Sequence, residues 1–215
     1  MAKKKRAPAP DLSVKSRLLE AALDCFNRKG YAATTVQEIV EAAGVTKPAL
    51  YYYFGSKEGI YRHLMEAAFV SFARLLALED IPGKTARGRL EWLCEEAYAI
   101  FRDHLAVARL MYSIYYGPPQ GAPPFDFDRF HFAFQERIRA LLVEGRKAGE
   151  FHFSKPEDAM WAIIGALNIA MEVDLCHPEM ALKKKDLRRV LALVFDGVSQ
   201  RPARSMRKPR KGAQP

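Results

Sequence analysis

Apolar side chains recur at steps of three and four residues along most of this chain. Leu18, Ala22, Cys25 and Phe26 form one such run. These steps place side chains on one face of an α-helix, whereas a half-buried strand needs strict alternation. Only the short segment 151–153 alternates in that way. The pattern predicts an all-α protein with nine helices, at residues 12–29, 35–42, 46–53, 57–79, 86–104, 106–116, 126–148, 156–176 and 184–200.

Glycine and proline residues separate these predicted helices. Gly30, Gly44 and Gly55 follow the first three, where a left-handed residue after a helix favours glycine. Four prolines between residues 117 and 124 predict a long loop. Helices before residue 56 are short and those after it are long. We therefore predict a three-helix head (11–56), a larger six-helix domain (57–200) and two tails (1–10 and 201–215).

Composition and charge describe an ordinary globular protein with basic ends. The chain has 215 residues, of which 49% are hydrophobic and 27% charged, and its formal net charge is +9. Residues 1–10 carry four Lys or Arg, residues 201–215 carry six, and 24 basic and 25 acidic residues lie between them. The tails are predicted to be disordered, and either bind polyanions weakly or simply aid solubility. Charge alone therefore does not indicate DNA binding.

The distribution of charged, apolar and cysteine residues disfavours several classes of protein. The longest stretch without charged residues, 110–125, contains four prolines, and the next, 159–171, is too short to span a membrane. The basic N-terminus is not followed by an apolar run, so no secretory signal is predicted. The three cysteines are odd in number and far apart, which favours reduced thiols and a cytoplasmic protein.

The informative stretch lies between residues 31 and 59. Thr35 and Glu38 have the spacing of a capping box at a helix start. Gly44 gives a tight turn, after which Thr46 is predicted to cap a second short helix with Pro48 in its first turn. Two short helices joined by a glycine turn are a helix-turn-helix, which places its second helix in a DNA major groove.

The outward side chains of this unit suit nucleic-acid recognition. Hydroxyls and helix N-termini bind phosphate, lysine reaches guanine or phosphate, glutamine pairs with adenine, and an alanine methyl meets a thymine methyl. The alternative is that Tyr51, Tyr52 and Tyr53 form the edge of an aromatic core, but a seven-residue helix cannot bury three successive positions. The predicted DNA-binding residues are Thr35, Gln37, Thr46, Lys47, Ala49, Tyr51, Tyr52 and Lys57.

At these residues the sequence resembles the TetR family of transcriptional regulators. The resemblance rests on the segments 34–39, 42–54 and 56–58, and covers about residues 13–63. It implies a homodimeric, ligand-relieved repressor that binds a near-palindromic operator. It assigns Thr35 and Lys57 to phosphate. It places Gln37, Lys47, Ala49, Tyr51 and Tyr52 on the base-reading surface.

The resemblance also implies a pocket for a small-molecule effector in the larger domain, for which we expect an apolar or aromatic molecule. Aromatic and methionine side chains at helical spacing are core residues more often than ligand contacts, and each polar candidate has an ordinary surface or core interpretation too. Phe72, Tyr115, His131 and Trp161 are further candidates in the same region. The predicted pocket residues are Phe69, Trp92, Tyr98, Phe101, His104, Met111, Tyr112, Phe130, Phe134 and Asn168.

The last two helices carry small and apolar residues that suit close helix packing. Burial within one subunit is the alternative, but the resemblance implies that these helices pair across a two-fold axis. The predicted dimer residues are Ala162, Ile163, Ala166, Leu167, Ala170, Val190, Val194 and Val198. The helix at 57–79 is predicted to be the lever between pocket and head.

Three other functions are alternatives to a regulator. No paired carboxylates, nucleophile motif, phosphate loop or metal-ligand spacing stands out, so we expect no enzyme activity, cofactor or metal. The second rival is a helical partner-binding protein that does not read DNA, and the base-edge side chains argue against it. Membrane-surface binding by the basic ends is disfavoured because they lack amphipathic spacing.

Overall fold

The computed structural model describes residues 13–199, so both predicted tails lie outside it. Within that range the chain forms nine α-helices, one short 3-10 helix and no strand, which confirms the all-α prediction. The α-helices are α1 (Val14–Lys29), α2 (Val36–Ala43), α3 (Lys47–Phe54), α4 (Lys57–Ala77), α5 (Ala86–Asp103), α6 (Leu105–Tyr115), α7 (Phe127–Lys147), α8 (Pro156–Cys176) and α9 (Lys184–Ser199).

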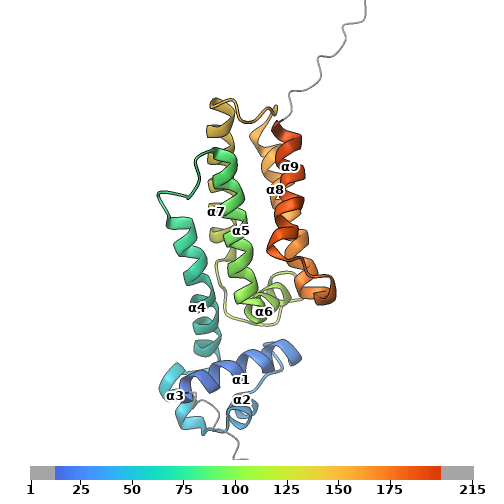
Figure 1. Ribbon diagram of the computed structural model, residues 1–215. Helices are drawn as coiled ribbons and strands as arrows, with labels where there is room; N and C mark the ends of the chain where they lie inside the picture. Colours follow the sequence, from blue (N-terminus) through green and yellow to red (C-terminus); the bar gives the residue numbers. More distant parts are fainter. Residues whose placement is uncertain (1–12, 200–215) are drawn as a thin grey trace, which may run out of the picture.

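The helices form a small head below a longer bundle (Figure 1). Helices α1, α2 and α3 make the head, and α4 rises from it along the side of the bundle. Helices α5, α7, α8 and α9 run roughly along the long axis of the molecule, and α8 lies beside α9. The short helix α6 lies at the base of the bundle, where it contacts α1.

Buried apolar side chains gather in two clusters. The bundle cluster is centred on Leu90, Ile138, Ile163 and Leu191 of α5, α7, α8 and α9. The head cluster draws on α1 to α4 and also on α6, so the boundary at residue 56 does not separate the two cores. Its buried members are Leu18, Ala22, Cys25, Phe26, Tyr31, Ile39, Val40, Ala43, Leu50, Ile60, Tyr61, Leu64, Met65, Ala68, Val107 and Leu110.

Polar contacts also join the head to the base of the bundle. The Asn27 side-chain amide donates to the Ala106 carbonyl at 2.9 Å. Gln120, in the loop between α6 and α7, accepts a hydrogen bond from the Tyr31 backbone N–H at 3.0 Å and donates to the Ser113 carbonyl at 3.2 Å. Because Gln120 bonds both the head and the end of α6, it bridges the two parts of the molecule.

The alternating segment 151–153 is not a strand. Phe151 is almost fully buried in the bundle cluster, and its ring lies against Gly145, where a Cβ atom would meet the ring at 2.5 Å. The His152 backbone N–H donates to the Val198 carbonyl at the end of α9. The alternation therefore reflects one buried side chain in a connection across the end of the bundle.

Helix α8 is longer and more apolar than its uncharged stretch suggested. It has 21 residues, and an 18-residue window in it reaches a mean hydropathy of 1.5, so by length and composition alone it could cross a membrane. Residues 159–171 are only the uncharged part of this helix. In the structure one side of α8 packs against α5, α7 and α9 within the bundle.

Candidate DNA-binding head, ligand cavity and subunit face

The helix-turn-helix is built by α2, α3 and the turn between them. Gly44 adopts a left-handed conformation (φ 62°, ψ 41°) that closes α2, and its N–H bonds the carbonyls of Val40 and Glu41. Leu50 is fully buried and anchors α3 on the head cluster, and Phe54 packs against the same cluster. Leu50 and Phe54 therefore form the inner face of α3.

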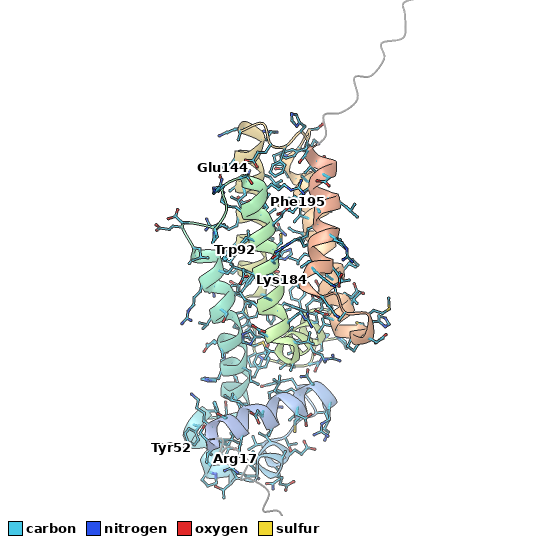
Figure 2. The ribbon with its side chains drawn as sticks, viewed as in Figure 1. Arg17, Tyr52, Trp92, Glu144, Lys184 and Phe195 are labelled. Atoms are coloured by element: carbon cyan, nitrogen blue, oxygen red, sulfur yellow. The ribbon has the colours of Figure 1, made fainter. Side chains whose placement is uncertain are left out.

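The opposite face of α3 is open to solvent. Tyr51, Tyr52 and Tyr53 are 51%, 82% and 43% exposed, and Tyr52 projects from the edge of the head (Figure 2). Lys47 is exposed at the N-terminal end of the helix, and Ala49 is partly buried. The alternative interpretation of the tyrosines as a core edge is therefore wrong. We call Lys47, Ala49, Tyr51 and Tyr52 the reading face.

The two helix starts that frame this face differ in their capping. The Thr35 hydroxyl accepts from the Glu38 N–H at 3.2 Å, and the Glu38 carboxylate accepts from the Thr35 N–H at 2.9 Å, which confirms the capping box. Thr46 was predicted to cap α3 in the same way, but its side chain makes no capping bond. The prediction was wrong for the hydroxyl, because Pro48 at the second position has no N–H and the Ala49 N–H at the third bonds the Thr46 backbone carbonyl at 3.1 Å instead.

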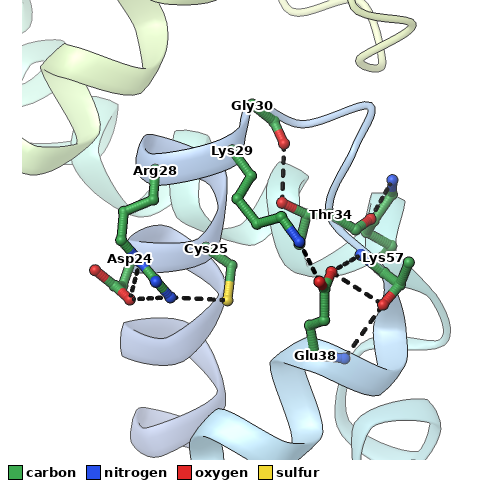
Figure 3. Close-up of polar contacts among 9 residues, drawn as sticks. Asp24, Cys25, Arg28, Lys29, Gly30, Thr34, Glu38 and Lys57 are labelled. Carbon is green, nitrogen blue, oxygen red and sulfur yellow. Dashed lines mark hydrogen bonds and ion pairs between the residues drawn. The ribbon is translucent and has the colours of Figure 1, made fainter.

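Charged and polar partners steady the first helices of the head. The Lys29 ammonium pairs with Glu38, and this hydrogen bond is the main reason that the Glu38 pKa falls to about 2 (Figure 3). The Gln37 side-chain amide donates to the Glu41 carboxylate one turn along α2. Both Gln37 and Thr35 therefore stand on the exposed start of α2 with their side chains already oriented.

Lys57 has a structural role that the sequence did not reveal. Its ammonium donates to the carbonyls of Tyr31 and Thr34 at 2.9 and 2.8 Å, and lies 4.4 Å from the centre of the Tyr31 ring. Partial burial lowers the pKa of Lys57. The side chain therefore ties the first turn of α4 to the loop before α2. Backbone carbonyls leave no mark on a sequence, so no sequence signal could have found these contacts.

A cavity of about 240 Å³ opens between α4, α5, α6, α7 and α8. Eight of the ten predicted pocket residues line it, and Phe72, Tyr115 and His131 do so as well. The predicted members are Phe69, Phe101, His104, Met111, Tyr112, Phe130, Phe134 and Asn168. The lining residues that sequence reasoning missed are Ala68, Ala97, Ile100, Val107, Ala108, Tyr116, Phe127, Asp128, Leu167 and Met171.

Trp92 and Tyr98 do not line this cavity, so their assignment was wrong. The cavity face of α5 carries Ala97, Phe101 and His104 at helical steps. Trp92 lies five residues before Ala97, which is about 140° around the helix, and packs against the bundle cluster. Tyr98 is buried on the side of α5 nearer to α9, where its hydroxyl donates to the Leu182 carbonyl at 3.0 Å.

Exposed lining residues, among them Tyr115, Tyr116 and Asp128, form the mouth of the cavity. The Tyr115 hydroxyl donates to the Asp128 carboxylate at 2.7 Å, and this bond raises the pKa of Tyr115. Burial, together with the nearby Tyr116 and Glu172, raises the pKa of Tyr112 to about 12. Both phenols are therefore neutral at physiological pH. Tyr115 donates its proton to Asp128, and the Tyr112 hydroxyl can donate to a ligand.

The predicted dimer residues fall on two sides of their helices. Ile163, Leu167 and Ala170 are at most 1% exposed inside the bundle, so they are wrong as surface contacts. Ala162 is exposed, and Ala166, Val190, Val194 and Val198 are partly buried. Large apolar side chains that stay uncovered on this side are Trp161, Ile169 and Leu193. Small residues occur on both sides of α8, so its sequence did not reveal which side faces outwards.

Comparisons with known proteins agree with this arrangement. Residues 18–64 match the model of bacterial regulatory proteins of the tetR family. The transcriptional regulator AcuR of Cereibacter sphaeroides is 34% identical over 163 residues, which are 71% of this chain and 72% of AcuR. The transcriptional repressor KstR2 of Rhodococcus jostii is 37% identical over 110 residues, which are 47% of this chain and 52% of KstR2. This chain thus spans about half the length of some curated relatives that it matches.

A solved structure extends the likeness beyond the head. The TetR-family transcriptional regulator PfmR of Thermus thermophilus superposes with a TM-score of 0.63 at 25% sequence identity. The alignment covers 86% of this chain and all of the PfmR chain. The similarity in fold therefore includes most of the bundle as well as the helix-turn-helix.

Proposed function

We propose that this chain, which belongs to the TetR family of bacterial transcriptional regulators, is a cytoplasmic repressor. It binds a near-palindromic operator as a homodimer, and a small apolar or aromatic effector in the cavity releases it. The observation that carries the proposal is the reading face, where Lys47 and the exposed tyrosines stand outwards on a helix that buried Leu50 holds in place.

The head supplies two kinds of contact to DNA. The reading face enters the major groove, where Lys47 approaches a guanine edge or a phosphate and the tyrosines present rings and hydroxyls to the bases. The exposed N-terminus of α2, with Thr35 and Gln37, and the free hydroxyl of Thr46 lie towards the backbone or the neighbouring base. Lys57 keeps one N–H beyond its two carbonyl partners, and we propose a phosphate as its third acceptor.

The second subunit binds the side of α8 and α9 that the bundle leaves uncovered. A dimer matches two reading helices to half-sites one turn of DNA apart, about 34–36 Å. Trp161, Ile169 and Leu193 leave apolar surface uncovered there, and Gly165 and Gly197 have open space beside them. Such a surface of large and small residues suits close packing of helices from two subunits.

Release follows from a coupling between cavity and head. Helix α4 starts at Lys57 beside the head and carries Phe69 and Phe72 into the cavity wall. Helix α6 contributes Val107 to both the cavity wall and the head cluster. An effector that favours one arrangement of these helices lowers DNA affinity, and DNA lowers effector affinity by the same factor.

Selection of bound DNA from a random pool will supply the operator, and alanine variants will then test the reading face. We expect Lys47→Ala and Tyr51→Ala each to weaken operator binding by about 1–3 kcal/mol, roughly 5- to 150-fold. Both side chains are exposed, so the melting temperature stays unchanged. Fluorescence anisotropy at fixed salt measures the affinity, with Lys147→Ala at the far end of α7 as control. Unchanged affinity in both variants favours the partner-binding protein instead.

The variant Ile169→Glu tests the proposed dimer interface on α8 and α9. A charge at this 61% exposed position meets the partner subunit, and light scattering is expected to report a monomer. Operator affinity then falls roughly 100-fold, because the two heads are no longer linked. Val70→Glu on the exposed side of α4 is the matched control and stays dimeric. A dimeric Ile169→Glu protein with full affinity contradicts this placement of the interface.

A further inference from the structure

We propose that the cavity takes a compact organic cation, a molecule with a quaternary or protonated amine on an apolar body. The inference rests on the proposed function, because it names the chemistry of the effector in that same cavity. Three observations carry it: the aromatic wall, the sign of the charge at the mouth, and the size of the space.

Aromatic rings form a large part of the wall. Nine aromatic side chains line the cavity, and those of Tyr112, Tyr115, Tyr116 and Phe127 gather near Asp128 at one end. The faces of such rings carry negative electrostatic potential, so several of them around one space attract a cation that has shed part of its water. Purely aliphatic walls would offer the same apolar burial without this preference for charge.

The charged groups around the cavity also favour a cationic ligand. Asp128 is the one Asp, Glu, Lys or Arg among the lining residues of the described chain. Glu172 adds a second carboxylate close enough to raise the pKa of Tyr112. The Arg129 guanidinium lies 4.6 Å from the centre of the Phe130 ring, but Arg129 does not line the cavity. An anionic ligand would therefore meet a carboxylate without a lining Lys or Arg to compensate it.

Asp128 is placed to serve as the counter-ion. It lies in the first turn of α7, where the helix dipole stabilises its negative charge. One of its oxygens accepts the Tyr115 hydroxyl at 2.7 Å, so the carboxylate is oriented while its other oxygen has no partner among residues 13–199. A cation between this carboxylate and the rings of the mouth receives both kinds of attraction at once.

The volume limits the ligand to a small body. About 240 Å³ lies below the range of roughly 300–1,000 Å³ that drug-sized ligands occupy. The described wall holds few other polar groups, chiefly His104, His131 and Asn168 besides the tyrosine hydroxyls. These observations favour one ring or short chain with a single charged nitrogen.

Three meta-substituted phenols separate charge from apolar burial: a cation, a neutral isostere of the same shape, and a smaller anion. Isothermal titration calorimetry will compare (3-hydroxyphenyl)trimethylammonium with its neutral isostere 3-tert-butylphenol and with the anion 3-hydroxybenzoate. We expect the cation to bind at least about ten-fold more tightly than the isostere, in line with cation–π and ion-pair contributions, and the anion to bind most weakly.

Two variants then locate the charge effect. Asp128→Asn is expected to reduce the advantage of the cation over the isostere several-fold while it leaves binding of 3-tert-butylphenol unchanged. Asp158→Asn is the matched control, because Asp158 also lies in the first turn of a helix, α8, but does not line the cavity. It is expected to leave all three affinities unchanged.

The outcomes separate this inference from the proposed function. Equal binding of cation and isostere, tightest binding of the anion, no binding of any probe at millimolar concentration, or an unaltered cation preference in Asp128→Asn each overturns the inference. Operator binding by the same ligand-free protein is measured in parallel. If it is intact, the DNA-binding part of the proposed function stands whatever the probes do, and if it is absent the regulator itself is overturned.

Discussion

The head and the bundle use the same residue types for opposite purposes. In the head, apolar side chains fill a small core and the chemistry stands outside it, so Leu50 is buried while its neighbours Tyr51 and Tyr52 face solvent. In the bundle most of the aromatic rings face inwards, and some of them line a cavity while others fill the core. Function in the head is thus separable from packing, whereas in the bundle the two share one set of side chains.

The two regions also place their carboxylates differently. Glu38 in the head pairs with Lys29 at the surface. Glu95 in the bundle is only 4% exposed and accepts two hydrogen bonds from the Arg188 guanidinium at 2.5 and 2.7 Å, with Lys184 also close. Surface pairs contribute little because water and salt screen them, while a buried carboxylate depends on its partner. Stability of the bundle is therefore expected to depend more on its ion pairs.

In the head, packing and the exposed reading face use different side chains, and this difference predicts the largest effect on the free energy of unfolding. Leu50→Ala is expected to lower the free energy of unfolding by about 2–5 kcal/mol, because it leaves a cavity under α3. Tyr52→Ala changes that free energy by less than about 0.5 kcal/mol, because an 82% exposed ring contributes little packing. Urea unfolding followed by circular dichroism measures both. Similar losses in the two variants would mean that the reading face also holds the head together.

The buried carboxylate predicts a smaller effect that depends on pH. The Arg188 hydrogen bonds lower the pKa of Glu95 below its ordinary value of 4.5. A lowered pKa in the folded state adds stability above the unfolded pKa, and this contribution is lost as the pH falls through the folded pKa. Glu95→Gln is therefore expected to lower the free energy of unfolding by about 1–3 kcal/mol at pH 7. The loss is moderate because the Arg188 side chain is exposed, so its charge stays hydrated when the carboxylate is removed.

The pH series provides the test for Glu95. The difference in unfolding free energy between wild type and Glu95→Gln should shrink as the pH falls below about 4.5. Glu96→Gln, whose carboxylate contacts the exposed Lys184 at 3.4 Å, is the control and is expected to change the unfolding free energy less than Glu95→Gln at pH 7. A constant penalty in Glu95→Gln down to pH 2 contradicts the assignment of its stability to the ionised form.

The bridge between the two regions predicts the smallest effect. Gln120→Ala removes the acceptor of the Tyr31 N–H and is expected to cost about 0.5–1.5 kcal/mol. Hydrogen exchange at the Tyr31 amide should become faster, while the amides of α8 keep their protection. Gln135→Ala on α7, whose side chain bonds His131 and not the head, is the control. An unaltered exchange rate at Tyr31 would show that Gln120 does not hold the head.

Much of this molecule could be predicted from the sequence, and the exceptions have a common cause. Helix ends follow from local signals such as the Thr35 box and Gly44, which act within a few residues. The reading face follows because a short helix cannot bury three successive tyrosines. The rotation of α8, the exclusion of Trp92 and Tyr98 from the cavity and the carbonyl contacts of Lys57 all depend on neighbours distant in the chain.

The contribution of Val107 and Leu110 to the head cluster bears on protein engineering. A chimaera that joins residues 13–56 to the bundle of another regulator would lose these buried contacts with the head helices α1 to α3. Grafts that also carry α4, α6 and the following loop to Gln120 would keep those contacts. The proposed reading face can instead be changed alone, because the exposed side chains of Lys47, Tyr51 and Tyr52 are not members of the head cluster.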